Sequence, residues 1–285
     1  KGIPVLASNV TIDLRGFSME GAGVGDDAIF ANSGISGLTV RNGIISDWVK
    51  EGVDGFYSNG CTLESLQVRN SVAGYGLITG TGSIIRNCAV SGSAVGIVTT
   101  PDCAVIDCTA QGNTSGGFLL GSGSTATRCA ASASTTAPAP GFSCADGVTL
   151  ANCTARANNG YGIDASNDCT ITQCTSVGNV GGIRVANGGV ISASTASRNT
   201  GAYGIVVTGA GTTIQGCTVD SNSLDGIRVA SNCLVLQNTC NANGNVVGSP
   251  GSGIFTTGSG NRLDSNLTTN NLFVGIALNG SNNFM

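Results

Sequence analysis

The sequence predicts an all-β fold, a parallel β-helix of about 12 coils of 20–27 residues, built as one domain over residues 1–285. Three observations predict it. A glycine followed by a β-prone residue recurs every 20–27 residues, apolar residues alternate with polar ones inside each unit, and no window has the 3.6-residue period of a helix. Since a unit this short cannot bury its own apolar face, the units must stack.

The repeating glycines define where each coil begins. Counting 12 residues on from most of them reaches a second fixed row, which contains five cysteines. Length varies only in the other half of the coil, at residues 132–141 and 241–251. With a rise of ~4.8 Å per coil, the rod is roughly 55 to 60 Å long. The glycine row is Gly55, Gly76, Gly96, Gly117, Gly141, Gly162, Gly182, Gly204, Gly226, Gly253 and Gly275, after a degenerate unit at Ala28.

Each coil contains short strands separated by Gly, Asn and Ser corners. Ile163 and Ala165 alternate with Asp164, which is the period of a strand with one buried face. About three such strands fit into a coil of 21 residues. The core therefore lies inside the coil, and every second residue points outward.

The phrase "NxGxxGIxV…CxITxCTxxxN" resembles the right-handed parallel β-helix repeat of the pectate-lyase-like superfamily. The opening "SNVTIDLRGFSMEG" resembles the first coils of bacterial secreted members. The likeness covers nearly the whole chain and implies a right-handed coil and an extracellular or cell-surface location. It does not imply one activity, because the superfamily includes polysaccharide lyases, hydrolases, epimerases, phage tailspikes and proteins with no known reaction.

The cysteines are expected to form a structural ladder of free, buried thiols. In-register side chains keep their Cβ atoms ~4.8 Å apart, beyond the ~3.8 Å mean of a disulfide. A linear stack cannot converge on Zn²⁺, and the chain has no His, so we expect no metal and no cofactor. Cys61, Cys103, Cys169 and Cys233 lie at another corner, too far apart to pair. The ladder is Cys88, Cys108, Cys129, Cys153 and Cys174.

A second ladder is predicted five residues after the cysteine row. Its asparagine side chains can hydrogen-bond the same group one coil away, and asparagine tolerates left-handed corners. We therefore assign them to the scaffold. They are Asn113, Asn158, Asn179, Asn199, Asn222, Asn243 and Asn270.

Composition excludes several functions. Charged residues make up 10% of the chain, the net charge is −4 and no basic stripe is present, which disfavours nucleic-acid binding. No apolar run is long enough for membrane insertion. The absence of His excludes Ser-His-Asp chemistry, and it departs from the Asp trio with His and Arg-x-Lys that resemblance to polygalacturonases would imply. Pectate-lyase-like cleavage would need a Ca²⁺-binding acidic cluster with an Arg or Lys base, but the carboxylates are dispersed.

Candidate site residues lie in the outward row that follows the glycines. Asp164, Arg184 and Arg228 are weak catalytic candidates that could hold a uronate carboxylate. The plain alternative, which we favour, is a surface salt bridge between Asp164 and Arg184 worth about 0 to 1 kcal/mol. The row is Tyr57, Ile78, Val98, Leu119, Ser143, Asp164, Arg184, Val206, Arg228, Phe255 and Ala277.

The N-terminal half of this row is apolar. Tyr57, Ile78, Val98 and Leu119 would form an exposed stripe, bordered by the corner that holds Trp48. Such a patch is typical of a contact surface, unless a loop of the same chain folds over it.

Two function classes remain. Neither end carries an amphipathic capping helix, so coils of neighbouring molecules could stack into a homo-oligomer or homopolymer. The leading hypothesis is a non-enzymatic extracellular structural or adhesive protein that self-associates end to end into a filament, or laterally through the apolar stripe. The alternative is a carbohydrate-active β-helix that binds an acidic polysaccharide, or cleaves it in a lyase-like reaction.

Overall fold

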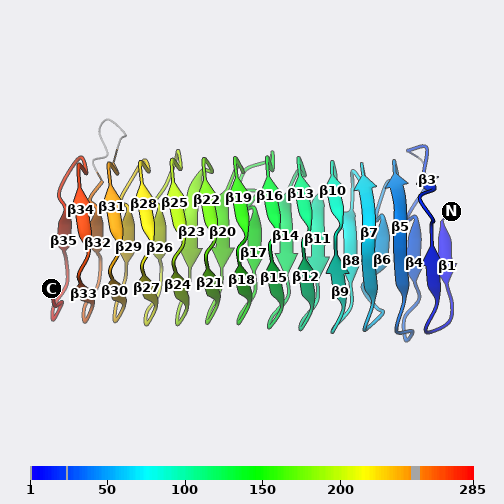
Figure 1. The fold of residues 1–285 in the computed structure, drawn as a ribbon, viewed down its shortest axis with the longest axis horizontal. Coiled ribbons are helices and arrows are strands. Elements are labelled where there is room, and N and C mark those ends of the chain that lie inside the picture. Colours follow the sequence, from blue (N-terminus) through cyan, green and yellow to red (C-terminus); the bar gives the residue numbers. More distant parts are fainter. Residues whose placement is uncertain (1, 24, 245–250) are drawn as a thin grey trace.

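The computed structural model describes residues 2–23, 25–244 and 251–285, and it is a right-handed parallel β-helix. The coils stack side by side along one axis, with the N-terminus at one end and the C-terminus at the other (Figure 1). One face is a sheet with one strand per coil, all parallel and in register. Its strands are β1 (Ile3–Val5), β4 (Ile29–Ala31), β6 (Val53–Gly55), β8 (Tyr75–Thr79), β11 (Val95–Thr99), β14 (Gly116–Leu120), β17 (Phe142–Cys144), β20 (Tyr161–Ala165), β23 (Gly181–Val185), β26 (Ile205–Val207), β29 (Ile227–Val229), β32 (Ile254–Thr256) and β35 (Ile276–Leu278). We call it the 13-stranded sheet.

The other two faces of the coil belong to a second, 22-stranded sheet. One face contains β2 (Thr11–Asp13), β5 (Thr39–Ser46), β7 (Thr62–Arg69), β9 (Ile84–Arg86), β12 (Ala104–Ile106), β15 (Thr125–Thr127), β18 (Thr149–Ala151), β21 (Thr170–Thr172), β24 (Val190–Ser192), β27 (Thr213–Gln215), β30 (Leu234–Leu236) and β33 (Arg262–Asp264). The other contains β3 (Ser18–Glu20), β10 (Ala89–Ser91), β13 (Thr109–Gln111), β16 (Ala130–Ser132), β19 (Thr154–Arg156), β22 (Thr175–Val177), β25 (Thr195–Ser197), β28 (Thr218–Asp220), β31 (Thr239–Asn241) and β34 (Leu267–Thr269). The long strands β5 and β7 run across both. Within the described residues, no helix is long and apolar enough to cross a membrane.

The core fills the inside of the coils, as the alternating pattern predicts. Ile163, Ile183 and Ile205 come from the 13-stranded sheet and are fully buried, as are Ile171 and Ile191 from the sheet opposite. Each such side chain stabilises the fold by about 1.5–3 kcal/mol. Stacking in register makes every coil a copy of this cross-section.

Most coils bend at three left-handed residues spaced five positions apart. In one coil these are Asp168 (φ 56°), Gln173 (φ 54°) and Gly178 (φ 64°), and in a later coil Gly260 (φ 75°), Ser265 (φ 54°) and Asn270 (φ 53°). The ladder residue follows each bend. The predicted ladder position of Asn270 is therefore wrong: Asn270 occupies the bend and is exposed, and its neighbour Asn271 accepts the hydrogen bond from the backbone N of Asn243 at 3.0 Å.

The one-residue shift has a simple cause. The corner after β32 has five residues (257–261), whereas the corner after β29 has four (230–233). Counting a fixed 12 residues from Gly253 therefore stops one position short. The long corner predicted at 241–251 falls partly outside the described residues, at 245–250.

The first glycine of the row also differs from the prediction. Val53 pairs with Leu77 and Asp54 with Ile78, so Gly52 rather than Gly55 corresponds to Gly76. The tight fit of the row explains why glycine recurs. A Cβ on Gly226 would lie 2.6 Å from the carbonyl oxygen of Gly253 in the next coil, a distance that real Cβ atoms do not adopt.

All twelve cysteines are free and buried. Ten of the thiols donate to backbone carbonyls, as Cys129 does to Val105 O at 3.5 Å and Thr127 O at 3.4 Å. Burial raises the pKa of Cys217 to about 11 and that of Cys240 to about 12, which keeps these two thiols protonated and poorly nucleophilic.

Candidate functional site

The outward face of the 13-stranded sheet carries two columns of side chains, one residue of each per coil. The strand register and the backbone hydrogen bonds between coils align them. The first column includes Asp27, Glu51, Tyr75, Val95, Tyr161, Gly181, Tyr203, Asp225 and Ser252. The second column includes Phe30, Asp54, Ile78, Val98, Leu119, Ser143, Asp164, Arg184, Val206, Arg228 and Phe255.

All four tyrosines of the protein lie on this outward face. Tyr75, Tyr161 and Tyr203 each precede the Gly-Ile or Gly-Leu pair that starts a strand, so the coil places them in the first column. Tyr57 follows β6 and lines the same surface. Because the strand sets the direction of each side chain, the short motif Tyr-Gly-Ile determines an outward-facing ring.

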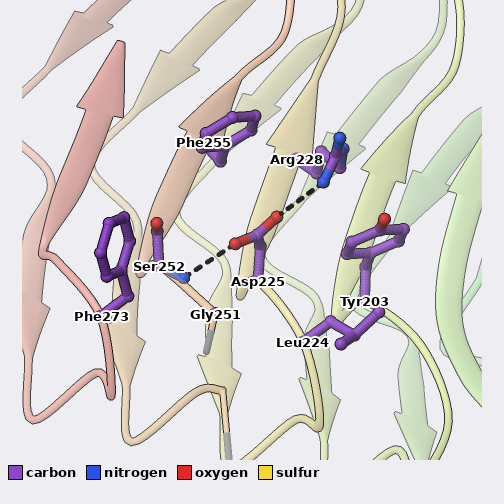
Figure 2. Close-up of a pocket in the computed structure, with 8 residues that line it drawn as sticks. All are labelled: Tyr203, Leu224, Asp225, Arg228, Gly251, Ser252, Phe255 and Phe273. Atoms are coloured by element: carbon purple, nitrogen blue, oxygen red, sulfur yellow. Dashed lines mark hydrogen bonds and ion pairs between the residues drawn. The ribbon is translucent and has the colours of Figure 1, made fainter. Parts of the chain in front are cut away.

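A pocket of about 250 Å³ lies over the C-terminal part of the face. Figure 2 shows the guanidinium of Arg228 between the rings of Tyr203 and Phe255. Its Cζ lies 5.0 Å from the centroid of Tyr203 and 4.9 Å from that of Phe255. Phe273 lines the pocket on the side away from Tyr203 (Figure 2).

Asp225 organises the polar side of this pocket. Arg228 Nη1 donates to Asp225 Oδ2 at 3.2 Å, and the backbone N of Ser252 donates to Asp225 Oδ1 at 2.8 Å (Figure 2). The Asp225 side chain is only 9% exposed. Fixed donors and acceptors between aromatic walls are the usual components of a site for a polar ligand with apolar faces.

A related arrangement lies two coils towards the N-terminus. Arg184 Nε and Nη2 donate to the two oxygens of Asp164 at 2.6 and 2.5 Å, and Arg184 Cζ lies 4.9 Å from the centroid of Tyr161. The bond to Asp164 raises the pKa of Arg184. Asp164 and Arg184 are thus paired on adjacent coils, as their positions in the outward row predict, and Arg228 lies further along the same column with Asp225 as its partner.

A larger groove, of about 480 Å³, lies over the N-terminal part of the face. Glu51 and Asp54 line it together with Tyr57, Tyr75 and Leu119. Burial, together with the nearby carboxylate of Asp27, raises the pKa of Glu51 to about 7. Burial also raises the pKa of Asp54. This groove therefore combines aromatic surface with carboxyl groups that hold protons more tightly than usual.

Replacing Glu51 by Gln should stabilise the protein at alkaline pH. The folded state holds a proton on Glu51 up to pH of about 7, while the unfolded state releases it near 4.5, so the free energy of unfolding of the native sequence falls between these values. Glu51→Gln should gain about 1 kcal/mol at pH 8 and nothing at pH 4, after allowance for solvent screening. Urea unfolding at both pH values measures this. Glu64→Gln, which loses an ion pair to Arg86, is the control, and equal gains at pH 4 and pH 8 would contradict the account.

The predicted contact residues are only partly exposed. Ile78 and Val98 are buried, so the expected exposed apolar stripe is wrong, and only Leu119 and Tyr57 remain open to solvent. Tyr57 is not in the row either, because Asp54 takes the position in register with Ile78. Trp48 is 7% exposed and donates from Nε1 to Met19 O near β3 and β5, away from the outward face. The error at Tyr57 comes from the less regular lengths of the early coils, whereas Ile78 and Val98 keep their predicted register and are buried in the groove.

Sequence reasoning missed several residues of the face. Glu51 and Asp54 went unnoticed because the first glycine was placed three residues late. Tyr161 and Tyr203 immediately precede the repeat glycine, and their shared Tyr-Gly-Ile motif is the signal that could have found them. Phe273 is placed by the geometry of a later coil and has no such signal.

Comparison with known proteins gives the following similarities. Residues 141–285 match the family model described as a right-handed beta helix region, and residues 31–189 match that of the periplasmic copper-binding protein NosD. No curated protein sequence matches the chain.

Three solved structures share the fold at low sequence identity. The A-module of the mannuronan C-5 epimerase AlgE4 from Azotobacter vinelandii is 13% identical, with a TM-score of 0.61 over 97% of this chain and 86% of its own. The AlgE6 A-module from the same organism is 16% identical, with a TM-score of 0.61 over 98% and 89%. The tailspike of E. coli bacteriophage HK620, solved with a pentasaccharide, is 9% identical, with a TM-score of 0.65 over 97% and 72%.

The residues present do not fit the copper named in the NosD description. The sequence has no His, and in the described ranges no three His, Cys, Asp or Glu side chains converge to hold a metal ion. The cysteine thiols are buried inside the coils. Soft thiolate or imidazole ligands that converge are what copper requires.

Proposed function

Because this chain belongs to the family of right-handed β-helix proteins, whose coils repeat at a fixed rise, we propose that it binds a polysaccharide along the outward face of the 13-stranded sheet. The observation that carries the proposal is the concentration of aromatic rings on this face. All four tyrosines lie there, with Phe30, Phe56, Phe255 and Phe273. Ring faces pack against the C–H faces of sugars, and neighbouring polar groups bond the hydroxyls.

The comparisons support a carbohydrate ligand more than a structural filament. The epimerase modules are named for mannuronan, and the tailspike was solved with a bound pentasaccharide. The periplasmic description of NosD supports a location outside the cytoplasm, in the periplasm or outside the cell. End-to-end or lateral self-association stays a prediction of the sequence.

We expect a neutral glycan rather than the acidic polysaccharide that the sequence suggested. Arg184 and Arg228 are already neutralised by Asp164 and Asp225. The N-terminal groove adds Glu51 and Asp54, so a polyuronate would meet net negative charge along the face. An Arg–Asp pair can instead bind hydroxyl groups, because the carboxylate accepts hydrogen bonds from them and the guanidinium donates hydrogen bonds to their oxygen atoms.

Affinity electrophoresis with soluble polysaccharides tests the proposal. Gels would contain a neutral mixed-linkage β-glucan, a galactomannan or dextran, or the acidic alginate or polygalacturonate. We expect at least one neutral polymer to retard the protein, and Tyr203→Ala to weaken that retardation roughly tenfold. Tyr203→Phe keeps the ring and should behave like the native protein. Unchanged migration in every gel, or retardation by acidic polymers alone, would refute it.

A further inference from the structure

The outward face alternates with a period of two coils between Tyr161 and Arg228. In the first column Tyr161, Gly181 and Tyr203 follow one another, and in the second column Arg184, Val206 and Arg228 do. A ring or a guanidinium therefore alternates with a small or apolar residue in both columns. Val206 is 5% exposed, and a Cβ on Gly181 would lie 2.5 Å from Tyr161 Cδ1, so the ring of Tyr161 rests against Gly181.

The alternation creates two similar units. In each, an arginine lies over the tyrosine ring of the preceding coil, at 4.9 Å in Arg184 and 5.0 Å in Arg228. Each arginine is also paired with an aspartate, so each unit is neutral and offers both donors and acceptors. Two steps of a parallel sheet separate the units by ~10 Å along the rod.

We propose that these two units are consecutive subsites for a neutral, extended glycan with equatorial 1,4 linkages, whose disaccharide repeat spans two coils. The inference rests on the proposed function and specifies its ligand. In such a ribbon each sugar is turned over relative to the one before, so every second sugar presents the same edge. A glycan lying along the rod would therefore meet like units with like edges, and the sugar between them would pass over Gly181 and Val206.

The two subsites are not equally open. Arg184 uses both Nε and Nη2 for Asp164, whereas Arg228 bonds Asp225 through Nη1 and, in the described part of the chain, makes no further hydrogen bond. Arg228 also borders the pocket of about 250 Å³, which has room for a sugar ring beside Asp225 and Ser252. A short ligand should therefore occupy the Arg228 subsite, and a longer one should extend to Tyr161.

Isothermal titration with defined oligosaccharides tests this inference. The probes are cellobiose and cellohexaose, mannobiose and mannohexaose, and the α-1,4-linked maltohexaose, which coils instead of forming a flat ribbon. We expect a β-1,4 hexaose to bind at 1:1 stoichiometry and at least about tenfold more tightly than maltohexaose. Tyr161→Ala should weaken hexaose binding about tenfold and leave the biose unaffected, whereas Tyr203→Ala should weaken both.

Each Ala variant needs a control for folding. Its binding is compared with that of the Phe variant at the same position, and thermal melting checks that both variants are folded. The inference is overturned if no β-1,4 hexaose binds, if maltohexaose binds as tightly, or if Tyr161→Ala affects both lengths equally. None of these outcomes contradicts the proposed function, which the polysaccharide gels test. Unchanged migration in every gel would contradict both the proposed function and this inference.

Discussion

Asn222→Ala is expected to lower the free energy of unfolding by about 3–5 kcal/mol, one of the largest effects of a single substitution in this protein. The Asn222 Oδ1 atom accepts from both the backbone N and the Nδ2 of Asn199, at 3.2 and 2.8 Å. Its own Nδ2 donates to Asn243 Oδ1 and to Ala196 O, both at 2.9 Å. Alanine removes all four bonds to the two flanking coils and leaves the buried backbone N–H of Asn199 without its acceptor.

Equilibrium unfolding in urea measures this effect. Asn187→Ala is the matched control, because Asn187 also bonds the coils on both sides but is exposed to solvent. Its Nδ2 donates to Asn167 Oδ1 at 2.8 Å, and its Oδ1 accepts from the backbone N of Ala210 at 2.9 Å. Water can replace those bonds, so the control should lose less than about 1 kcal/mol. Equal losses of unfolding free energy in the two variants would show that the buried asparagine ladder stabilises the fold no more than exposed hydrogen bonds do.

Gly226→Ala should destabilise the fold by about 3 kcal/mol or more. The new Cβ would lie 2.6 Å from Gly253 O and 2.7 Å from Asn243 Nδ2, so the coils must separate or the asparagine ladder must shift. Thermal unfolding measures the loss.

Gly201→Ala is the control for this substitution. Gly201 is exposed, and the nearest atoms to its Cβ would be Val180 Cγ1 at 3.0 Å and Val180 O at 3.6 Å, on a partly exposed side chain that can move. The free energy of unfolding of the Gly201→Ala protein should change by roughly 0.5 kcal/mol at most, since alanine also lowers the conformational entropy of the unfolded chain. A Gly226→Ala protein as stable as Gly201→Ala would contradict the close contact between coils.

The repeat was readable in the sequence because the fold is one cross-section copied many times. Because the same position recurs in every regular coil, neighbouring coils confirm each assignment. The predicted positions of the cysteine row and of the asparagines from Asn113 to Asn243 are therefore confirmed by the structure. The errors came where a coil changes length. Asn270 was assigned to the ladder because the corner at 257–261 has one residue more, and Gly55 was chosen over Gly52 in the irregular early coils.

The candidate site was less predictable than the fold. Asp164, Arg184 and Arg228 lie in their predicted column, because the register decides which coil faces which. The structure adds that each arginine lies over a tyrosine, which depends on side-chain directions that sequence spacing does not specify. Ile78 and Val98 are buried in the groove that Tyr57 and Leu119 also line, which sequence spacing does not specify either.

The central claim is that a glycan lies along the outward face of the 13-stranded sheet, and a crystal structure with a bound oligosaccharide tests it most directly. Crystals would be grown with the hexaose that binds most tightly. The account predicts sugar density parallel to the rod axis, with rings beside Tyr161 and Tyr203 and hydroxyls bonded to Arg228 and Asp225. Sugar bound only to the faces of the 22-stranded sheet, or lying across the rod, would contradict it.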